Sequence, residues 1–236
     1  MDRNFARALA LVLKSEGGWS DNPADPGGAT MKGVTLASFR RYVKADARKA
    51  DLRAISDAQV ATVYRRFYWD AVLGAELPDG VDHAVFDFAV NSGPGRAAKY
   101  LQAAVGVAQD GRIGPVTVAA AKAKPAGVTI DALCDARLAF LKRLPTWATF
   151  GRGWSDRVRS VRVQALLMSA QGPAAPVAAP ASPRVETSAD VMPATQPVQP
   201  ASGGKTAAAA GILVLMAGAL AAFRHRVADF FGGLFQ

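Results

Sequence analysis

An abrupt change of composition after about Ala170 constrains the fold more than any other feature of the chain. Seven of the fourteen prolines fall between residues 171 and 204, alanine is frequent there, and no aromatic residue is present. Such a segment cannot bury enough apolar surface to fold, so we predict a disordered, semi-extended linker over residues 171–205. A packed domain must therefore be built from residues 1–170.

A stretch of uncharged residues, Thr206–Phe223, follows the linker. As a helix it would extend about 27 Å, close to the hydrocarbon core of a bilayer at about 30 Å. We predict a C-terminal transmembrane helix here and an interfacial tail over residues 224–236. The alternative is an alanine-rich helix that packs on protein. Small residues such as Gly211 and Gly218 would let such tails self-associate.

The formal net charge of +9 belongs mostly to residues 1–170, since residues 171–236 contribute only +1. A basic body attracts polyanions, which include nucleic acids, anionic membranes and acidic wall polymers. Several arginines fall mostly on the polar face of one predicted helix, where a solvated surface is the ordinary explanation: Arg152, Arg157, Arg159 and Arg162. No nucleic-acid motif accompanies them, so no specific nucleic-acid partner is expected.

Cysteine and histidine are too scarce for a metal centre. The sequence has one cysteine, Cys134, and two histidines, His83 and His225. No zinc-site spacing is present, and we expect neither a metal nor a cofactor. Cys134 lies in an apolar helical pattern and is predicted to be a core residue. No long uncharged apolar stretch precedes Lys14, so no cleaved signal peptide is expected.

The pattern of apolar residues in the first 170 positions predicts a mainly α fold. Ser56 and Gln59 form a capping box before one apolar stripe, and Thr35 is suited to be the N-cap of a helix over residues 36–43. The exception is the polar stretch Gly17–Val34, rich in Gly, Pro, Asn and Asp, where we expect a small hairpin or ordered loop. Long ordered loops in helical domains are commonly functional.

Glu16 ends the first predicted helix, directly before Gly17 and Gly18. The helix dipole and burial would both raise the pKa of its carboxyl group. A carboxyl group that keeps its proton near neutral pH can act as the general acid in glycosidic cleavage. From position alone, however, an ordinary solvated glutamate at a helix end is the better explanation of Glu16.

The residues around and after Glu16 change this assessment. The segment contains these motifs: Glu16-Gly17-Gly18-Trp19, Asp25-Pro26-Gly27-Gly28, Thr30 and Gly33-Val34-Thr35. This series resembles the N-terminal signature of the glycoside hydrolase family 108 muramidases, which belong to the lysozyme-like superfamily. The resemblance implies a lysozyme-like helical domain of the phage endolysin type. It also implies a lytic enzyme that cleaves the β-1,4 linkage from N-acetylmuramic acid to N-acetylglucosamine in bacterial peptidoglycan.

The resemblance also implies a set of catalytic residues. Glu16 would protonate the leaving oxygen, while Asp25 and Thr30 would hold and activate water. Asp25 follows Glu16 by nine residues, as in phage lysozymes, whereas the spacing to Thr30 is one residue shorter. Asp21 is the rival carboxylate, and a turn before Pro26 is the structural explanation for Asp25.

Two further residues are candidates for substrate binding. Trp19 would either stack on a sugar ring or anchor the loop to the core, and we weight these equally. Asn91 lies where an apolar helix ends at a glycine, which is its structural explanation. In the family this part of the chain lines the cleft, so Asn91 is a candidate for binding an acetamido group.

The second half of the body resembles the predicted peptidoglycan-binding segment that commonly follows this catalytic region. The residues that carry this likeness are Leu101-Gln102, Val105-Gly106-Val107, Asp110-Gly111, Ile113-Gly114-Pro115, Thr117, Gly153-Trp154 and Arg157-Val158. We therefore expect a catalytic region over residues 1–92 and a helical peptidoglycan-binding region over residues 93–170. Pro115 is also expected to open a helix.

Two other functions compete with the muramidase. A lytic transglycosylase also uses a glutamate but closes the muramic acid onto itself without water, and Asp25 and Thr30 favour hydrolysis. A non-catalytic cell-wall-binding phage protein is the alternative from a different class. The tail predicts inner-membrane association, with the enzyme acting on periplasmic peptidoglycan. Arg224 and Arg226 outweigh Lys205, which would keep the C-terminus cytoplasmic. Because no export signal is expected, the alternatives are a cytoplasmic pool released when the membrane fails and a slow post-translational insertion.

Overall fold

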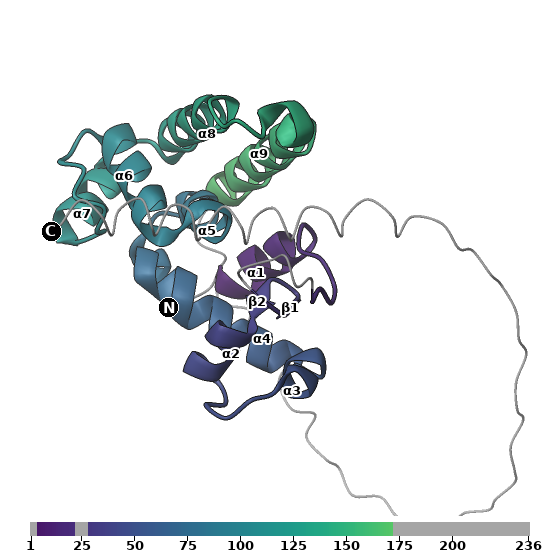
Figure 1. The fold of residues 1–236 in the computed structure, drawn as a ribbon. Coiled ribbons are helices and arrows are strands. Elements are labelled where there is room, and N and C mark those ends of the chain that lie inside the picture. Colours follow the sequence, from purple (N-terminus) through teal and green to yellow (C-terminus); the bar gives the residue numbers. More distant parts are fainter. Residues whose placement is uncertain (1–3, 22–27, 172–236) are drawn as a thin grey trace, which may run out of the picture.

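The computed structural model describes residues 4–21 and 28–171 (Figure 1). Within these ranges the chain is mainly helical with one small two-stranded antiparallel sheet, which confirms the predicted helical class. The linker, the predicted transmembrane helix over residues 206–223 and the tail lie outside the described residues. Over the part of the chain that is described, no helix is long and apolar enough to cross a membrane.

From Thr30 onward, consecutive helices and strands are joined by connections of nine residues or fewer. In chain order they are α1 (Phe5–Leu13), β1 (Thr30–Met31), β2 (Val34–Thr35), α2 (Leu36–Tyr42), α3 (Lys49–Arg53), α4 (Asp57–Tyr64), the π-helical turn η1 (Arg65–Trp69), the 3₁₀ turns η2 (Asp70–Val72) and η3 (Gly74–Glu76), α5 (Val81–Ser92), α6 (Pro94–Val105), α7 (Pro115–Ala123), α8 (Ala126–Lys142) and α9 (Trp147–Ala170).

Helix α5 is the centre of the molecule. Residues 81–91 are all buried, as expected for a helix that is surrounded by core on every side. It packs against α1 and the η turns as well as against α6, α8 and α9. Figure 1 shows α5 between the N-terminal elements and the group α6 to α9. One cluster of buried apolar side chains therefore extends from α1 to α9.

Several helix starts follow the local sequence signals. Ser56 and Gln59 form the predicted capping box at α4, with each side chain bonded to the other's backbone N–H. Thr35 caps α2 by accepting a hydrogen bond from the Ser38 amide at 3.1 Å. Pro115 is the first residue of α7, where its missing N–H is harmless. Cys134 is buried, as predicted.

The predicted hairpin is present between Thr30 and Thr35. Met31 pairs with Val34, and the two residues between them, Lys32 and Gly33, have φ values of 49° and 73°. Positive φ at both central residues is typical of the type I′ turn, whose twist matches antiparallel strands. Ser20 adds a bridge to Thr30, so the segment that follows Glu16 is tied to the hairpin.

Helix α1 ends earlier than its glycine pair suggested. Its last helical residue is Leu13, and the chain continues through a turn in which the Glu16 amide donates to the Leu13 carbonyl at 3.2 Å. Hydrogen bonds that span three residues, in place of the four of an α-helix, commonly tighten the end of a helix. Glu16 therefore follows α1 directly and remains hydrogen-bonded to its last turn.

Candidate active site

The Glu16 side chain is nearly buried, with 11% of its surface exposed. It lies between α1, the β1–β2 hairpin and helix α9. Oxygen Oε1 accepts hydrogen bonds from both Nη atoms of Arg157 at 3.3 Å. The solvated glutamate that position alone allowed is therefore not what the structure contains.

Arg157 was expected on a solvated helix face, and this expectation was wrong. Its side chain is 12% exposed and faces α5, where Asp87 accepts from its Nη2 at 3.0 Å and from its Nε at 3.1 Å and 3.2 Å. The residue comes from the middle of α9, which turns this side toward the core because Trp154, Val158 and Val161 are buried. Arg152 and Arg159 on the same helix are exposed.

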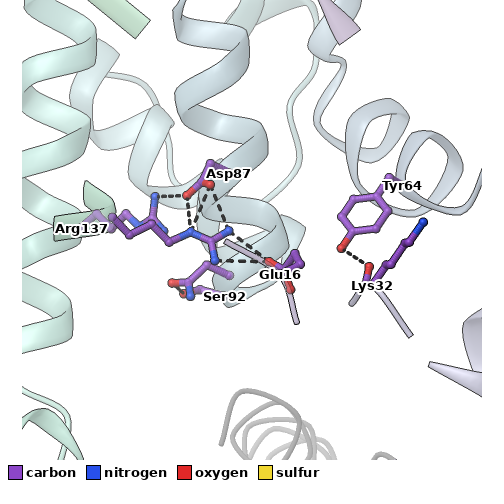
Figure 2. A network of polar contacts seen from close by, with 8 residues as sticks. Glu16, Lys32, Tyr64, Asp87, Ser92 and Arg137 are labelled. Atoms are coloured by element: carbon purple, nitrogen blue, oxygen red, sulfur yellow. Dashed lines mark hydrogen bonds and ion pairs between the residues drawn. The ribbon is translucent and has the colours of Figure 1, made fainter. Parts of the chain in front are cut away.

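Asp87 joins a second arginine to the network. Its Oδ1 accepts from Nη1 of Arg137 at 2.7 Å, and both side chains are only 2% exposed. Burial opposes the charge of Asp87, but Arg157 and Arg137 outweigh burial and hold the pKa of this carboxyl well below its ordinary value. Figure 2 shows the resulting chain of contacts from Arg137 through Asp87 to Glu16.

The other side of the Glu16 carboxyl group faces the hairpin turn. A Cβ atom placed on Gly33 would lie 2.8 Å from Oε2 of Glu16 and 2.2 Å from Oη of Tyr64. The hydroxyl of Tyr64 donates to the Lys32 carbonyl at 3.0 Å, and Figure 2 shows this bond beside Glu16. Glycine at position 33 therefore lets a carboxyl group and a phenol approach the same point of the backbone.

Tyr64 lies where the helix type changes. It is the last residue of α4, and the chain continues as the π-helical turn η1. A π turn inserts extra backbone into a helix, shifts the direction of the side chains around it, and is frequent at functional sites. Tyr64 is almost fully buried and contacts the rings of Tyr68 and Phe86.

The structure places two predicted site residues on the segment that follows Glu16. Thr30 is buried in β1, and its backbone pairs with Ser20 at 2.8 Å and 2.9 Å. Trp19 is half-buried, packs against the core and has the Arg53 guanidinium 5.3 Å from its ring centroid. The predicted roles of both residues toward substrate remain predictions.

Asn91 and the two candidate aspartates have different positions. Asn91 is buried one helical turn after Asp87 and accepts a hydrogen bond from the Ser92 hydroxyl at 3.1 Å. Asp25 lies outside the described residues. Asp21, its rival, forms an ion pair with Lys49 of α3 at 3.0 Å.

The sequence pattern did not predict the polar residues that contact Glu16 or its partners: Tyr64, Asp87, Arg137 and Arg157. Two of them carried a signal. Asp87 is a charged residue between Phe86 and Phe88 in an apolar helix, and Arg137 lies among the apolar residues of another. Charges at such positions require partners, because an unpaired buried charge is very unfavourable. The sequence does not, however, indicate which residue is the partner.

This arrangement is suited to proton transfer. Glu16 is a carboxyl group removed from most solvent, with one oxygen hydrogen-bonded to a guanidinium and the other close to the hairpin turn. Among the residues described, no three His, Cys, Asp or Glu side chains are grouped as metal ligands. The chemistry that these side chains offer is that of a general acid or base.

Comparison with known proteins gives the class. The family model described as Glycosyl hydrolase 108 matches residues 9–93. The solved structure titled "Structure of Brucella abortus SagA" is 48% identical, has a TM-score of 0.64, and its match covers 72% of this chain and 97% of that chain. A comparison with curated proteins found no match. The matches define a glycoside hydrolase of the muramidase type. The chain belongs to the glycosyl hydrolase 108 family, which indicates a lysozyme-like activity on peptidoglycan.

Proposed function

We propose that the chain hydrolyses the β-1,4 linkage between N-acetylmuramic acid and N-acetylglucosamine in peptidoglycan, with Glu16 as the general acid. The observation that carries the proposal is the placement of Glu16: a nearly buried carboxyl group, held by Arg157, beside the hairpin turn. In the proposed reaction Glu16 donates its proton to the glycosidic oxygen as the bond from that oxygen to the anomeric carbon breaks. Water supplies a hydroxyl group to the anomeric carbon and gives its proton to a second carboxylate.

The bond specificity is tested by the new ends of the glycan strands. Purified peptidoglycan is digested, reduced with borohydride and analysed by mass spectrometry. Hydrolysis at the proposed bond leaves reducing muramic acid, which becomes muramitol. Glucosaminitol would show cleavage of the other glycosidic bond, and an anhydro sugar would show a lytic transglycosylase. Either of these products would contradict the proposed linkage or reaction.

Glu16→Gln tests the acid directly. Glutamine has the same size and cannot donate a carboxylic proton, so we expect the rate to fall at least about a hundredfold. Binding to insoluble peptidoglycan and the circular dichroism spectrum should be retained. If the variant lysed peptidoglycan at more than about a tenth of the native rate, Glu16 would not be the acid, and a wall-binding role without catalysis at this site would be favoured.

We propose Asp25 as the second carboxylate, with Thr30 orienting the water. The proposal rests on the sequence resemblance and on the ion pair of Asp21 with Lys49, which gives the rival aspartate a structural partner. We expect Asp25→Ala to abolish most activity, Thr30→Ala to reduce it less, and Asp21→Ala to leave most of it. If Asp21→Ala abolished most activity and Asp25→Ala had a mild effect, Asp21 would be the second carboxylate in place of Asp25.

We further propose that residues 206–223 attach the enzyme to the inner membrane with its body on the periplasmic side. The support is the uncharged composition of this segment and the arginines that follow it. Full-length protein should stay with membranes after a carbonate wash, whereas Leu213→Arg, which adds a charge at the centre of the segment, should be released. Protease added from the periplasmic side should digest the body. Equal release of both proteins would overturn the anchor.

A further inference from the structure

Helix α9 brings a cation to Glu16 from outside the part of the chain that the family model matches. That match ends at residue 93, and Arg157 lies in α9, the last helix of the described residues. The Arg157 guanidinium contacts two carboxyl groups at once. It donates to Asp87 from Nε and Nη2, and to Glu16 from Nη1 and Nη2.

Asp87 and Arg137 fix the position of Arg157. The shorter contacts of the guanidinium, 3.0 Å to 3.2 Å, are those with Asp87, whereas both contacts with Glu16 are 3.3 Å. Asp87 is in turn held by Arg137 at 2.7 Å. The orientation of Arg157 therefore depends on buried partners in α5 and α8, and Glu16 contacts a guanidinium whose position is already set.

The two oxygens of Glu16 have different surroundings. Oε1 receives two N–H groups of Arg157, while Oε2 faces Gly33. A guanidinium can only donate hydrogen bonds and does not lose its proton in proteins. A proton on Oε1 would point at these donors, so the acid form of Glu16 carries its proton on Oε2.

The alternation of charge in the network determines how strongly Arg157 acts on Glu16. Arg137 and Arg157 are cations, and Asp87 and Glu16 are anions when ionised. When Glu16 is protonated, Arg137 and Arg157 share the single negative charge of Asp87, so the network carries a net positive charge. When Glu16 has given up its proton, the new negative charge lies beside Arg157, which stabilises it.

We propose that Arg157 is the positioning residue of the catalytic acid: it holds Oε1 so that the proton is presented on Oε2, and it stabilises the carboxylate left after proton transfer. This inference rests on the proposed role of Glu16. It makes α9 part of the catalytic unit, although the family match ends before this helix begins. In this proposal Arg157 acts on the substrate only through Glu16.

Other titratable groups near Glu16 determine what removal of Arg157 does. Asp87 and His83 come from α5, Arg137 from α8 and Tyr64 from α4. Burial lowers the pKa of His83, which favours its neutral form. Without Arg157, Glu16 and Asp87 no longer share a guanidinium, and the negative charge of Asp87 opposes ionisation of Glu16. Glu16 then keeps its proton to a higher pH, and the alkaline limb of the rate profile moves upward.

The test compares Arg157→Gln, Arg157→Lys and the control Arg159→Gln in the full-length chain. Arg159 is two residues away on the same helix, is 73% exposed and pairs with Asp156, three positions before it. Rates are measured on soluble glycan strands prepared from peptidoglycan, so that kcat and KM are obtained separately across the pH range. Folding is followed by circular dichroism and thermal unfolding.

We expect Arg157→Gln to lower kcat about tenfold to a hundredfold with little change in KM, and to move the alkaline limb to higher pH. Arg157→Lys keeps the positive charge but loses the paired donors of the guanidinium. We therefore expect its alkaline limb to stay near the native pH and its kcat to be intermediate. Arg159→Gln should match the native enzyme. The inference would be overturned if Arg157→Gln had the native kcat and the native pH–rate profile. It would also be overturned if kcat fell while the alkaline limb of the profile stayed at its native pH.

Two controls keep the outcomes distinguishable. If Arg157→Gln does not fold, Arg157→Lys decides, because a native kcat in the lysine variant would show that the paired donors are unnecessary. If Glu16→Gln is inactive while both Arg157 variants behave as native, this inference fails and the proposed function stands. If Glu16→Gln retains native activity, the proposed function fails, and the inference that depends on it fails too.

Discussion

Gly33 lies in the hairpin turn, beside Glu16 and Tyr64 of the candidate site. Its φ of 73° is strained for residues with a side chain, and the space where a Cβ would lie is filled by Glu16 and Tyr64. The Gly33-Val34-Thr35 motif therefore has a physical explanation in three parts. Glycine closes the hairpin turn and admits the carboxyl group, Val34 is buried in the core, and Thr35 caps α2.

We predict that Gly33→Ala reduces activity at least about tenfold, because the added methyl group displaces Glu16 or Tyr64 and a small misplacement of a reacting group has a large effect on rate. Gly106→Ala is the matched control. Its φ is 81°, but the nearest atom to an added Cβ is Nζ of Lys124 at 3.9 Å. Both variants should lose about 1–2 kcal/mol of stability from backbone strain. Equal rates on peptidoglycan for the two variants would contradict the steric explanation.

At the level of single residues, the sequence was most informative where the physical cause is local. The Thr35 cap and the capping box of Ser56 and Gln59 each involve residues three positions apart, and both are present. Glu16 could be selected only with the help of a family resemblance. Its actual partner, Arg157, is far away in the sequence, and an arginine on an amphipathic helix looks the same whether it faces solvent or a buried carboxylate.

Among the elements, α5 illustrates both what a helical pattern can predict and what it leaves out. The spacing of Val81, Val85, Phe88 and Ala89 predicts a helix with one apolar side, whereas residues 81–91 are all buried. A periodicity, however, shows which residues are apolar and not what surrounds the polar ones. Asp87 could be identified as unusual, whereas its partners depend on how α8 and α9 pack against α5. Tertiary packing of this kind has no local signature.

We predict that Asp87→Ala destabilises the protein by about 3–5 kcal/mol, because it leaves Arg137 and Arg157 buried without their shared anion. Asp156→Ala is the control, since Asp156 pairs with Arg159 at the surface, where both side chains are more than half exposed. It should cost less than about 1 kcal/mol. Urea unfolding monitored by circular dichroism measures both values. Similar losses in the two variants would show that the buried network contributes little to stability.

For the whole molecule, stability should depend on pH through Asp82. Burial raises the pKa of this carboxyl to about 6, although hydrogen bonds from Asn4 and from the His83 and Gly80 amides act in the opposite direction. The folded state therefore favours the protonated form. This contribution to stability is fully present below the ordinary pKa of 3.8 and is lost as the pH rises through about 6.

Asp82→Asn, which stays uncharged, isolates this effect. The free energy of unfolding of the variant minus that of the native protein should rise between pH 4 and pH 6 and level off above that range. Titratable groups elsewhere act alike in both proteins and cancel in the difference. Chemical unfolding at several pH values gives the measurement, and a difference that stays constant across this range would exclude Asp82 as the source.

The pairing of Glu16 with Arg157 spans 141 positions of the chain. A ribosome adds about 5–20 residues per second, so roughly 7–28 s pass between the synthesis of the glutamate and that of its arginine. During this interval the nascent chain carries Glu16 and the hairpin but lacks the guanidinium that contacts Glu16. Asp87 likewise precedes Arg137 by 50 positions and Arg157 by 70. The proposed site is therefore complete only after α9 has been made, and a nascent chain that is arrested before α9 lacks Arg157.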